Sequence, residues 1–320
     1  MKTPFHQGEL EIQQRANQLD IARRNGAIIQ RDIPQGAIAY MEQQLMVVVS
    51  NLDRDGKVWA SILFAQPGFI KVENTHQFIL NTDRLITSKL DTFWSNYQNN
   101  SKVGLLFIEF NTRRRLRING TIKQVNTDCY KICVDQAYSN CPSYIQPRHF
   151  SIHSENSPRQ NKNFYSDHYL YNRHINMIRQ ASFFFVGSAH ITNNNVSERN
   201  NSTGCDVSHR GGDPGFIKVI DENTLLIPDY QGNSMFNTLG NIQVYPEVGL
   251  VFIDFNKQRL LQISGEANIN WSEISENYQT KKTQRSWTLK VREWYETPLP
   301  DSLHWERKDE PNSHSDDNQL

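Results

Sequence analysis

One block of sequence occurs twice in this chain, and the repeat constrains the fold more than any other feature. Residues Pro67–Val72 recur letter for letter as Pro214–Val219. The segment Val103–Asn111, VGLLFIEFN, recurs as Val248–Asn256, VGLVFIDFN. The two offsets are 147 and 145 residues, so the copies run in the same order with almost no insertion between them. A period of this length predicts two tandem domains and not a solenoid of short repeats.

Within each copy, short runs rich in Val, Ile and Leu are separated by turn signals, which predicts strands. In the first copy the expected strands are 45–50, 58–64, 69–72, 76–80, 103–110 and 116–125, and the expected helices are 9–24, 34–44 and a stretch around 84–96. Many short strands with few helices indicate a mainly β fold, either a barrel or a sandwich.

These patterns divide the chain into five predicted segments. They are an N-terminal helical segment (1–44), a first β unit (45–148), a linker (149–170), a second β unit (171–300) and a disordered tail (301–320). The linker is rich in Ser, Asn, Gln and Pro, and the end of the chain is charged and polar.

Composition excludes several classes of function. Lys plus Arg and Asp plus Glu both number 34, so the basic excess typical of a nucleic-acid-binding protein is missing. The chain shows no signal-peptide pattern and no apolar run long enough to cross a bilayer, so we expect a cytoplasmic protein without a membrane partner. Cys129 and Cys133 lie on an expected strand with no second pair at zinc spacing, so no metal site is predicted.

The two copies differ just before the repeated Pro-Gly. Residues 58–65 read VWASILFA in the first copy, whereas 205–212 read CDVSHRGG in the second. Ser208, His209, Arg210 and Gly211 offer a hydroxyl, a guanidinium and a closely approachable backbone, which suit a phosphate oxyanion. The alternative is a hairpin with an exposed arginine, and Arg210 alone favours that alternative.

A second polar segment, 228–241, is dense in small hydrogen-bonding residues at the expected start of a helix. Asn233 or Ser234 suits the N-cap, and Asn237 and Thr238 would lie one turn further along. The start of a helix offers free N–H groups and a positive dipole to an anion. A capped helix without any ligand is the alternative, but together with Ser208 the pattern favours a ligand.

These segments resemble the flavin-binding split-barrel proteins related to pyridoxamine 5′-phosphate oxidase. The resemblance covers both halves of the chain, and its motifs are specific in combination. They are Val207–Phe216, Gly232–Asn241, Val248–Ile253, Phe5–Glu9 and Asn140–Gln146. The family implies two tandem split β-barrel units, with FMN bound between barrels and its phosphate held by Ser, Arg and Lys or Asn side chains.

The resemblance also implies roles for individual residues. The second copy would supply the FMN-binding residues, which are Ser208, His209, Arg210, Gly211, Asn233, Ser234, Asn237 and Thr238. The family places a cysteine similar to Cys141 near the flavin, although a buried, inert thiol is the commoner role. Arg148 and the basic run Arg113–Arg117 are further candidates for an anion contact. The first copy has Ile62–Phe64 at the position of His209–Gly211, so one flavin site per chain is expected.

The leading hypothesis is an FMN-dependent oxidoreductase of unknown substrate that takes electrons from NAD(P)H or a small reductant. No catalytic acid, base or nucleophile stands out, which suits a flavoenzyme because the cofactor carries the redox chemistry. A non-catalytic protein that stores or senses flavin or haem is the alternative, and a duplicated barrel with a vestigial site is a third reading. A homodimer is compatible with this family, which builds its sites at barrel interfaces.

Overall fold

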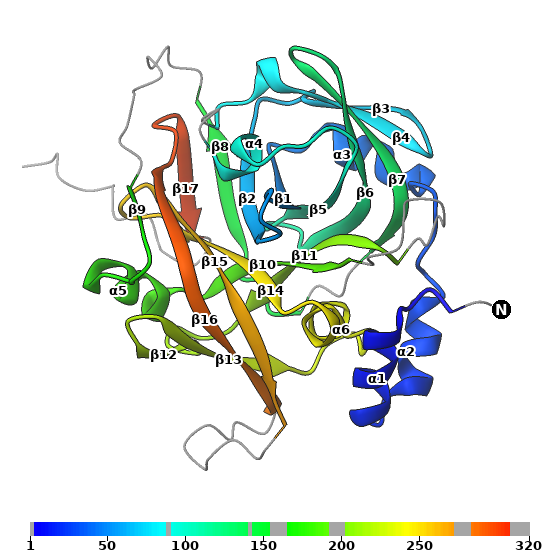
Figure 1. Ribbon diagram of the computed structural model, residues 1–320. Coiled ribbons are helices and arrows are strands. Elements are labelled where there is room, and N and C mark those ends of the chain that lie inside the picture. Colours follow the sequence, from blue (N-terminus) through cyan, green and yellow to red (C-terminus); the bar gives the residue numbers. More distant parts are fainter. Residues whose placement is uncertain are drawn as a thin grey trace, which may run out of the picture.

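Two large antiparallel sheets dominate the molecule, which confirms the mainly β class expected from the sequence (Figure 1). The computed structural model describes residues 3–87, 91–139, 143–153, 165–191, 202–271 and 283–307.

The first sheet has seven strands in the order β2-β1-β5-β6-β7-β4-β3. In chain order they are β1 (Met46–Leu52), β2 (Val58–Phe64), β3 (Ile70–Asn74), β4 (Gln77–Asn81), β5 (Ser101–Glu109), β6 (Arg114–Asn126) and β7 (Cys129–Ser139). All six strands expected in the first copy are present, within a few residues at their ends. The apolar runs form strands that bury their apolar side chains, on one face in β4, where Phe78 and Leu80 lie between partly exposed neighbours, and on both faces in β1 and β2.

The second sheet follows the same order, β11-β10-β14-β15-β16-β13-β12. Its strands are β10 (Phe183–His190), β11 (Gly204–Gly211), β12 (Lys218–Asp221), β13 (Thr224–Tyr230), β14 (Glu247–Asp254), β15 (Arg259–Asn270) and β16 (Thr283–Pro298), and the short β9 (Tyr165–Asp167) pairs with β16. Strand for strand, β10 to β16 take the places of β1 to β7, so the sequence repeat corresponds to two sheets of one topology. In neither sheet do the two end strands pair with each other within the described ranges, so neither sheet closes into a barrel.

A third, two-stranded sheet joins segments that the sequence placed in the linker and the tail. Strand β8 (Arg148–Ile152) pairs with β17 (Leu303–Arg307), and Phe150 stacks on Trp305 with ring centroids 4.6 Å apart. The disorder predicted for the whole tail is therefore wrong for residues 303–307. The pairing spans about half the chain, which is why no local pattern indicated it. The rest of the tail, from 308, lies outside the described residues.

Three of the six α-helices in the described part of the chain lie near the N-terminus. The helix expected over 9–24 is two helices, α1 (Gln7–Arg15) and α2 (Leu19–Gly26), because Asn17 between them has a positive φ of 55°. A 3-10 turn at Gln35–Ala37 leads into α3 (Ile38–Glu42).

The remaining helices accompany the sheets. Of the helical stretch expected around 84–96, the described residues contain a 3-10 turn at Thr82–Arg84 and the short α4 (Thr92–Ser95). In the second half, α5 (Asn172–Gln180) precedes β10, and α6 (Asn237–Val244) connects β13 to β14.

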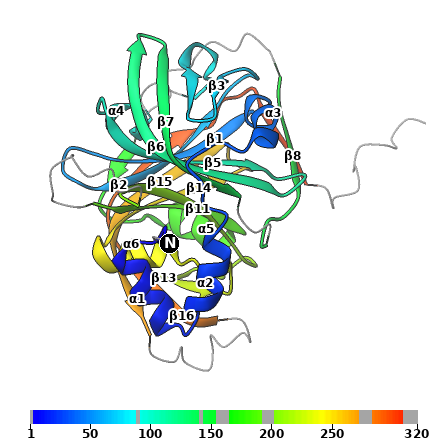
Figure 2. The ribbon, with the colours of Figure 1, turned by 90° about the vertical axis from the view of Figure 1, so that its right-hand side faces the viewer.

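The two sheets pack against each other, and Figure 2 shows the first lying over the second with α1 beside α6. Each sheet has its own apolar core, and a third core between them includes Phe64, Phe110 and Phe185. Two glycines allow the closest approach. A Cβ on Gly104 would lie 2.7 Å from the Cys205 carbonyl oxygen, and one on Gly249 would lie 2.7 Å from the Ala60 nitrogen. The repeated Val-Gly-Leu motif thus marks where each sheet meets the other.

The described residues also bear on two other features, a membrane-spanning helix and a metal site. None of their helices has both the length and the apolar character needed to span a bilayer. Within the same ranges no three His, Cys, Asp or Glu side chains gather in a way that could hold a metal ion.

Candidate functional site

A polar pocket lies where the two sheets meet the start of α6. The eight described residues that were predicted to bind a cofactor all line this pocket, and they are Ser208, His209, Arg210, Gly211, Asn233, Ser234, Asn237 and Thr238. The ninth, Cys141, lies outside the described residues. Segments some 25 residues apart in the chain therefore converge on one place, and their role in binding a cofactor stays a prediction.

Strand β11 places alternate side chains on opposite sides. Ser208 and Arg210 are partly exposed, whereas His209 between them is buried. The imidazole of His209 stacks on Phe183 with ring centroids 5.4 Å apart, and neither ring nitrogen has a hydrogen-bond partner. Burial, helped by Arg115 and Arg210, lowers the pKa of His209 well below its usual value. The His209 ring therefore packs among aromatic side chains in an environment that favours its neutral form, and its predicted contact with a phosphate or ribityl group stays a prediction.

Arg210 shares one carboxylate with a second arginine. Its Nη1 lies 3.6 Å from Asp229 Oδ1, while Arg285 Nε donates to Asp229 Oδ2 at 2.7 Å. Burial lowers the pKa of Arg210, and the Nε of Arg210 has no hydrogen-bond partner. Two guanidinium groups against one carboxylate leave this side of the pocket with an excess of positive charge, which favours an anion.

The first sheet contributes an arginine that the sequence indicated only as part of a basic run. Arg117 on β6 is 3% exposed and donates from Nε to the Val207 carbonyl (3.0 Å) and from Nη1 to the Tyr138 hydroxyl (2.7 Å). It also donates to Ser208 Oγ and lies 3.6 Å from Asp206 Oδ1.

Arg115 lines the same pocket. The two-residue spacing of Arg115 and Arg117 on a strand was the signal that both face one way. Both halves of the chain therefore build the pocket.

The helix start differs from the expected one. Helix α6 begins at Asn237, and its N-cap is Phe236 in the left-handed region with φ 58°. Neither predicted N-cap takes that place: Asn233 accepts a hydrogen bond from the Met235 N–H in the preceding turn (3.1 Å), and Ser234 is in the left-handed region with φ 63°. Asn237 and Thr238 are thus the first residues of the helix and lie closer to its free N–H groups than predicted. The Thr238 hydroxyl lies 3.3 Å from that of Ser208.

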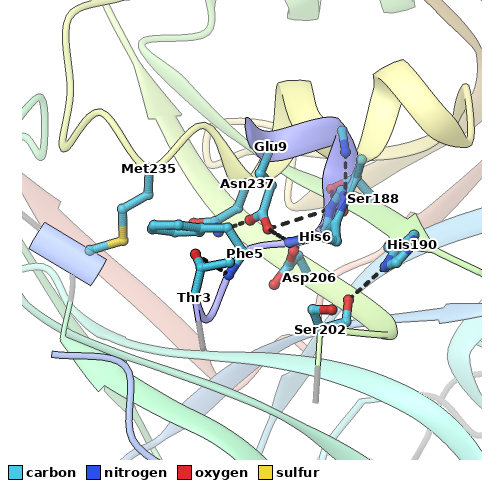
Figure 3. Close-up of polar contacts among 12 residues, drawn as sticks. Thr3, Phe5, His6, Glu9, Ser188, His190, Ser202, Asp206, Met235 and Asn237 are labelled. Atoms are coloured by element: carbon cyan, nitrogen blue, oxygen red, sulfur yellow. Dashed lines mark hydrogen bonds and ion pairs between the residues drawn. The ribbon is translucent and has the colours of Figure 1, made fainter. Parts of the chain in front are cut away.

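The N-terminal motif Phe5–Glu9 reaches this site through a buried polar network (Figure 3). His6 caps α1, because its Nδ1 accepts from the Gly8 N–H, and the Glu9 carboxylate accepts from the His6 N–H (2.8 Å). Glu9 also accepts a hydrogen bond from the side chain of Asn237, which in turn accepts one from Arg117 (3.1 Å). Through Glu9, the motif therefore holds Asn237 and the start of α6 in place beside the pocket.

Two titratable groups of the network are shifted toward their neutral forms. Burial, and after it the nearby Asp206 carboxylate, raises the pKa of Glu9 to about 8. Burial, followed by His190, lowers the pKa of His6 to about 4. His6 Nε2 lies 2.9 Å from Asn241 Oδ1, and Asn241 donates to Asp206 (2.8 Å). The network thus ties α1, α6 and β11 together around the Asp206–Arg117 ion pair.

The place where β2 of the first copy meets β15 of the second has a counterpart of this arrangement without the positive charge. Gln262 on β15 takes the place of Arg117 and donates to the Ala60 carbonyl (2.9 Å) and to Thr92 Oγ1 (2.7 Å). Ser61 takes the place of Ser208 and donates to Asp91 (2.5 Å). These polar groups bond to one another, and neither Gln262 nor Ser61 carries a charge. The expectation of one flavin site per chain stays a prediction.

Other candidates lie elsewhere. Arg148 is buried, sits over the Phe255 ring at 4.7 Å and donates to Ser182, and it does not line the pocket. At the rim, Tyr144 stacks on Tyr230 with ring centroids 5.5 Å apart, and the Tyr144 hydroxyl donates to the Gln231 carbonyl (3.2 Å). This aromatic pair was not anticipated, since Tyr144 and Tyr230 lie in different halves of the chain.

Comparison with known proteins gives only distant similarities. No protein-family model and no curated protein matches the chain. Among solved structures, a protein provisionally described as a pyridoxamine 5′-phosphate oxidase from Lactobacillus delbrueckii has a TM-score of 0.31 and 13% identity, covering 40% of this chain and 94% of that one.

Two further structures are similarly distant. HupZ from Group A Streptococcus has a TM-score of 0.30 and 9% identity, covering 42% of this chain and 97% of its own. An F420 reductase has a TM-score of 0.22 and 12% identity, covering 34% of this chain and 97% of its own. At such low TM-scores, none of these similarities bears on function.

Proposed function

We propose that this protein binds FMN through its phosphate in the pocket between the two sheets and works as a flavin-dependent oxidoreductase. The charge of the pocket is the observation that carries the proposal. Three arginines, Arg115, Arg117 and Arg210, line the pocket, whereas the carboxylates beside them are two, Asp229 next to Arg210 and Asp206 next to Arg117. An anionic ligand that accepts hydrogen bonds would balance this excess, and a phosphate does so with oxygens on every side.

The shape of the pocket suits the phosphate end of such a ligand. Its volume is about 110 Å³. One water needs roughly 10–15 Å³ on a comparable measure, so the space holds about seven to eleven water-sized groups, which is enough for a phosphate and the atoms attached to it but not for a whole flavin. The hydroxyls of Ser208 and Thr238 and the start of α6 supply neutral donors beside the arginines. The ring system would then extend toward the rim, where Tyr144 and Tyr230 form a flat aromatic surface.

In the enzyme reading, bound FMN would supply the redox chemistry, accepting electrons from NAD(P)H and passing them to a substrate. The protein's own residues bind and orient. Arg210 and Arg117 hold the anion, and Asn237 is fixed between Glu9 and Arg117 so that the helix start stays in place. His209, neutral and without a partner for its ring nitrogens, keeps the neighbouring wall uncharged.

Titration with FMN and with riboflavin, followed by flavin fluorescence, tests the phosphate assignment. Riboflavin lacks the phosphate, so the purified protein should bind FMN more tightly. The Arg210→Ala variant should weaken FMN binding by about 1.5–3 kcal/mol and leave riboflavin binding unchanged, because one charged hydrogen bond is lost. Arg54→Ala, in an exposed turn, is the matched control and should change neither. Equal affinity for the two flavins would refute the phosphate site.

Reduction of the bound flavin separates the enzyme from the alternative, a protein that stores or senses flavin. If NADPH or NADH bleaches the flavin absorbance of the complex within a physiological time, the oxidoreductase reading holds. A complex that binds FMN but stays oxidised under either reductant would leave the storage or sensing function in its place.

A further inference from the structure

A second hollow lies beside the phosphate pocket, on the outer side of the first sheet. It is formed by the residues before α3 on one side and by the β5–β6 turn on the other, with Tyr138 at the end of β7. Arg115 lines both this hollow and the phosphate pocket, so the two are neighbours. Its volume is about 580 Å³, within the range of roughly 300–1,000 Å³ found for small-molecule sites.

The walls of this hollow combine apolar surface with positive charge. Ile28, Pro34, Ala37, Tyr40 and Leu116 supply apolar atoms, and Ile28 is 44% exposed. A branched aliphatic side chain this exposed, beside an aromatic ring and a proline, leaves apolar surface that a ligand can cover.

Three arginines in sequence, Arg113, Arg114 and Arg115, form the opposite wall, and none of the described lining residues is acidic. Arg114 sits over the ring of Tyr40 at 4.8 Å and pairs with Glu109 at 2.8 Å, so Glu109 offsets one of the three positive charges. The local charge therefore favours an anion.

We propose that this hollow is a second ligand site, which takes a small organic anion with a flat apolar body. The apolar wall covers the body of the ligand, and the arginine wall meets its carboxylate or similar anionic group. The site is separate from the phosphate pocket, and the assignment does not depend on which cofactor that pocket binds. A ligand held here would lie next to a group bound in the phosphate pocket, since Arg115 separates the two.

The chain offers a position from which the hollow can be filled without disturbing the fold. Gly36 lines the hollow, and a Cβ built on it meets no atom within 4 Å. Its backbone also lies outside the left-handed region, so a larger residue is not strained there. Gly36→Trp should occupy the hollow with its side chain, and Gly36→Ala, which adds one carbon, is the matched control.

Calorimetric titration of the full chain with 2-naphthoate, and with its neutral analogue 2-naphthalenemethanol, tests the proposal. We expect 2-naphthoate to bind more tightly than the neutral analogue, Gly36→Trp to abolish binding and Gly36→Ala to retain it. Arg113→Gln should weaken 2-naphthoate by about threefold without changing the neutral analogue, as expected for an exposed charge.

The same titration with and without saturating FMN distinguishes this site from the phosphate pocket. Binding of 2-naphthoate in both conditions supports a separate site. Competition between FMN and 2-naphthoate would show one shared site and overturn the proposal. No binding of 2-naphthoate at millimolar concentration, or equal binding by Gly36→Trp, would also overturn it. A chain that ignores FMN but binds 2-naphthoate would refute the proposed function and leave this inference intact.

Discussion

Replacing Arg117 by glutamine tests whether one buried ion pair joins the two halves of the protein at the site. Arg117 comes from the first sheet and Asp206 from the second, with Nη1 and Oδ1 3.6 Å apart. At an effective dielectric constant of roughly 20, two unit charges at this distance attract by about 4–5 kcal/mol. Removing one partner of a buried pair costs about 3–5 kcal/mol, because the other charge stays buried without compensation.

Glutamine is the informative replacement because the other half of the chain already uses it at the corresponding place. Gln262 donates to the Ala60 carbonyl as Arg117 does to the Val207 carbonyl. Arg117→Gln can therefore keep that hydrogen bond, while it loses the charge and the guanidinium donors to Tyr138, Asn237 and Ser208. We expect the free energy of unfolding to fall by about 3 kcal/mol, at the lower end of the range for broken buried pairs.

Urea unfolding followed by tryptophan fluorescence measures this change. In the background of Asp206→Asn, the cost of Arg117→Gln should shrink by about 2–3 kcal/mol, since the coupling between the two charges is then absent. Arg114→Gln, an exposed arginine of the same run, is the control and should cost less than about 1 kcal/mol. If Arg117→Gln costs no more than this control, or the same in both backgrounds, the ion pair does not join the sheets as argued.

Two further predictions concern the same framework. Because the pKa of Glu9 is raised in the fold from 4.5 to about 8, its contribution to stability is fully present below about pH 4.5 and is lost as the pH rises through 8. Between pH 4.5 and 8, Glu9→Gln should flatten the fall of the unfolding free energy with pH, whereas Glu11→Gln on the exposed face of α1 should not. An unchanged slope for Glu9→Gln would contradict the raised pKa of Glu9. Gly249→Ala should lower the unfolding free energy by about 1–3 kcal/mol, because its Cβ would meet the backbone of Trp59 and Ala60 at 2.7 Å, while Gly36→Ala should have little effect. Equal melting temperatures for these two glycine variants would show that the sheets do not approach as closely as described.

Much of the architecture could be predicted from local pattern. The strands of the first copy appear where short runs rich in Val, Ile and Leu predicted them, and β1, β2 and β5 are continuous apolar runs because both of their faces are buried. The repeated Val-Gly-Leu motif anticipated that both halves would use one arrangement, and both sheets have the same strand order. The polar segments around Ser208 and Asn237 could be identified in the sequence, because a strand end and a helix start are both recognisable from their residues. The structure then brings the two segments together in one pocket.

Other parts of the site depended on which distant segments pair. The sequence suggested one function for the neighbours His209 and Arg210, but strand alternation buries the His209 ring against Phe183, although the residue still lines the pocket. Arg148 was a candidate for an anion contact, yet the aromatic rings of the second half surround it. Whether a polar residue faces a pocket or a core depends on the register and packing of strands, which a single segment does not encode.

Taken by itself, the sequence determined the repeat, the mainly β class and the position of the polar residues in the second copy. Tertiary structure alone decided that Arg117 of the first copy completes the site, that the Phe5–Glu9 motif supports α6, and that β8 and β17 pair across half the chain. The physical reason is one of range. Apolar periodicity and capping signals act over a few residues, whereas a buried ion pair or a third sheet forms only after the two halves have packed together.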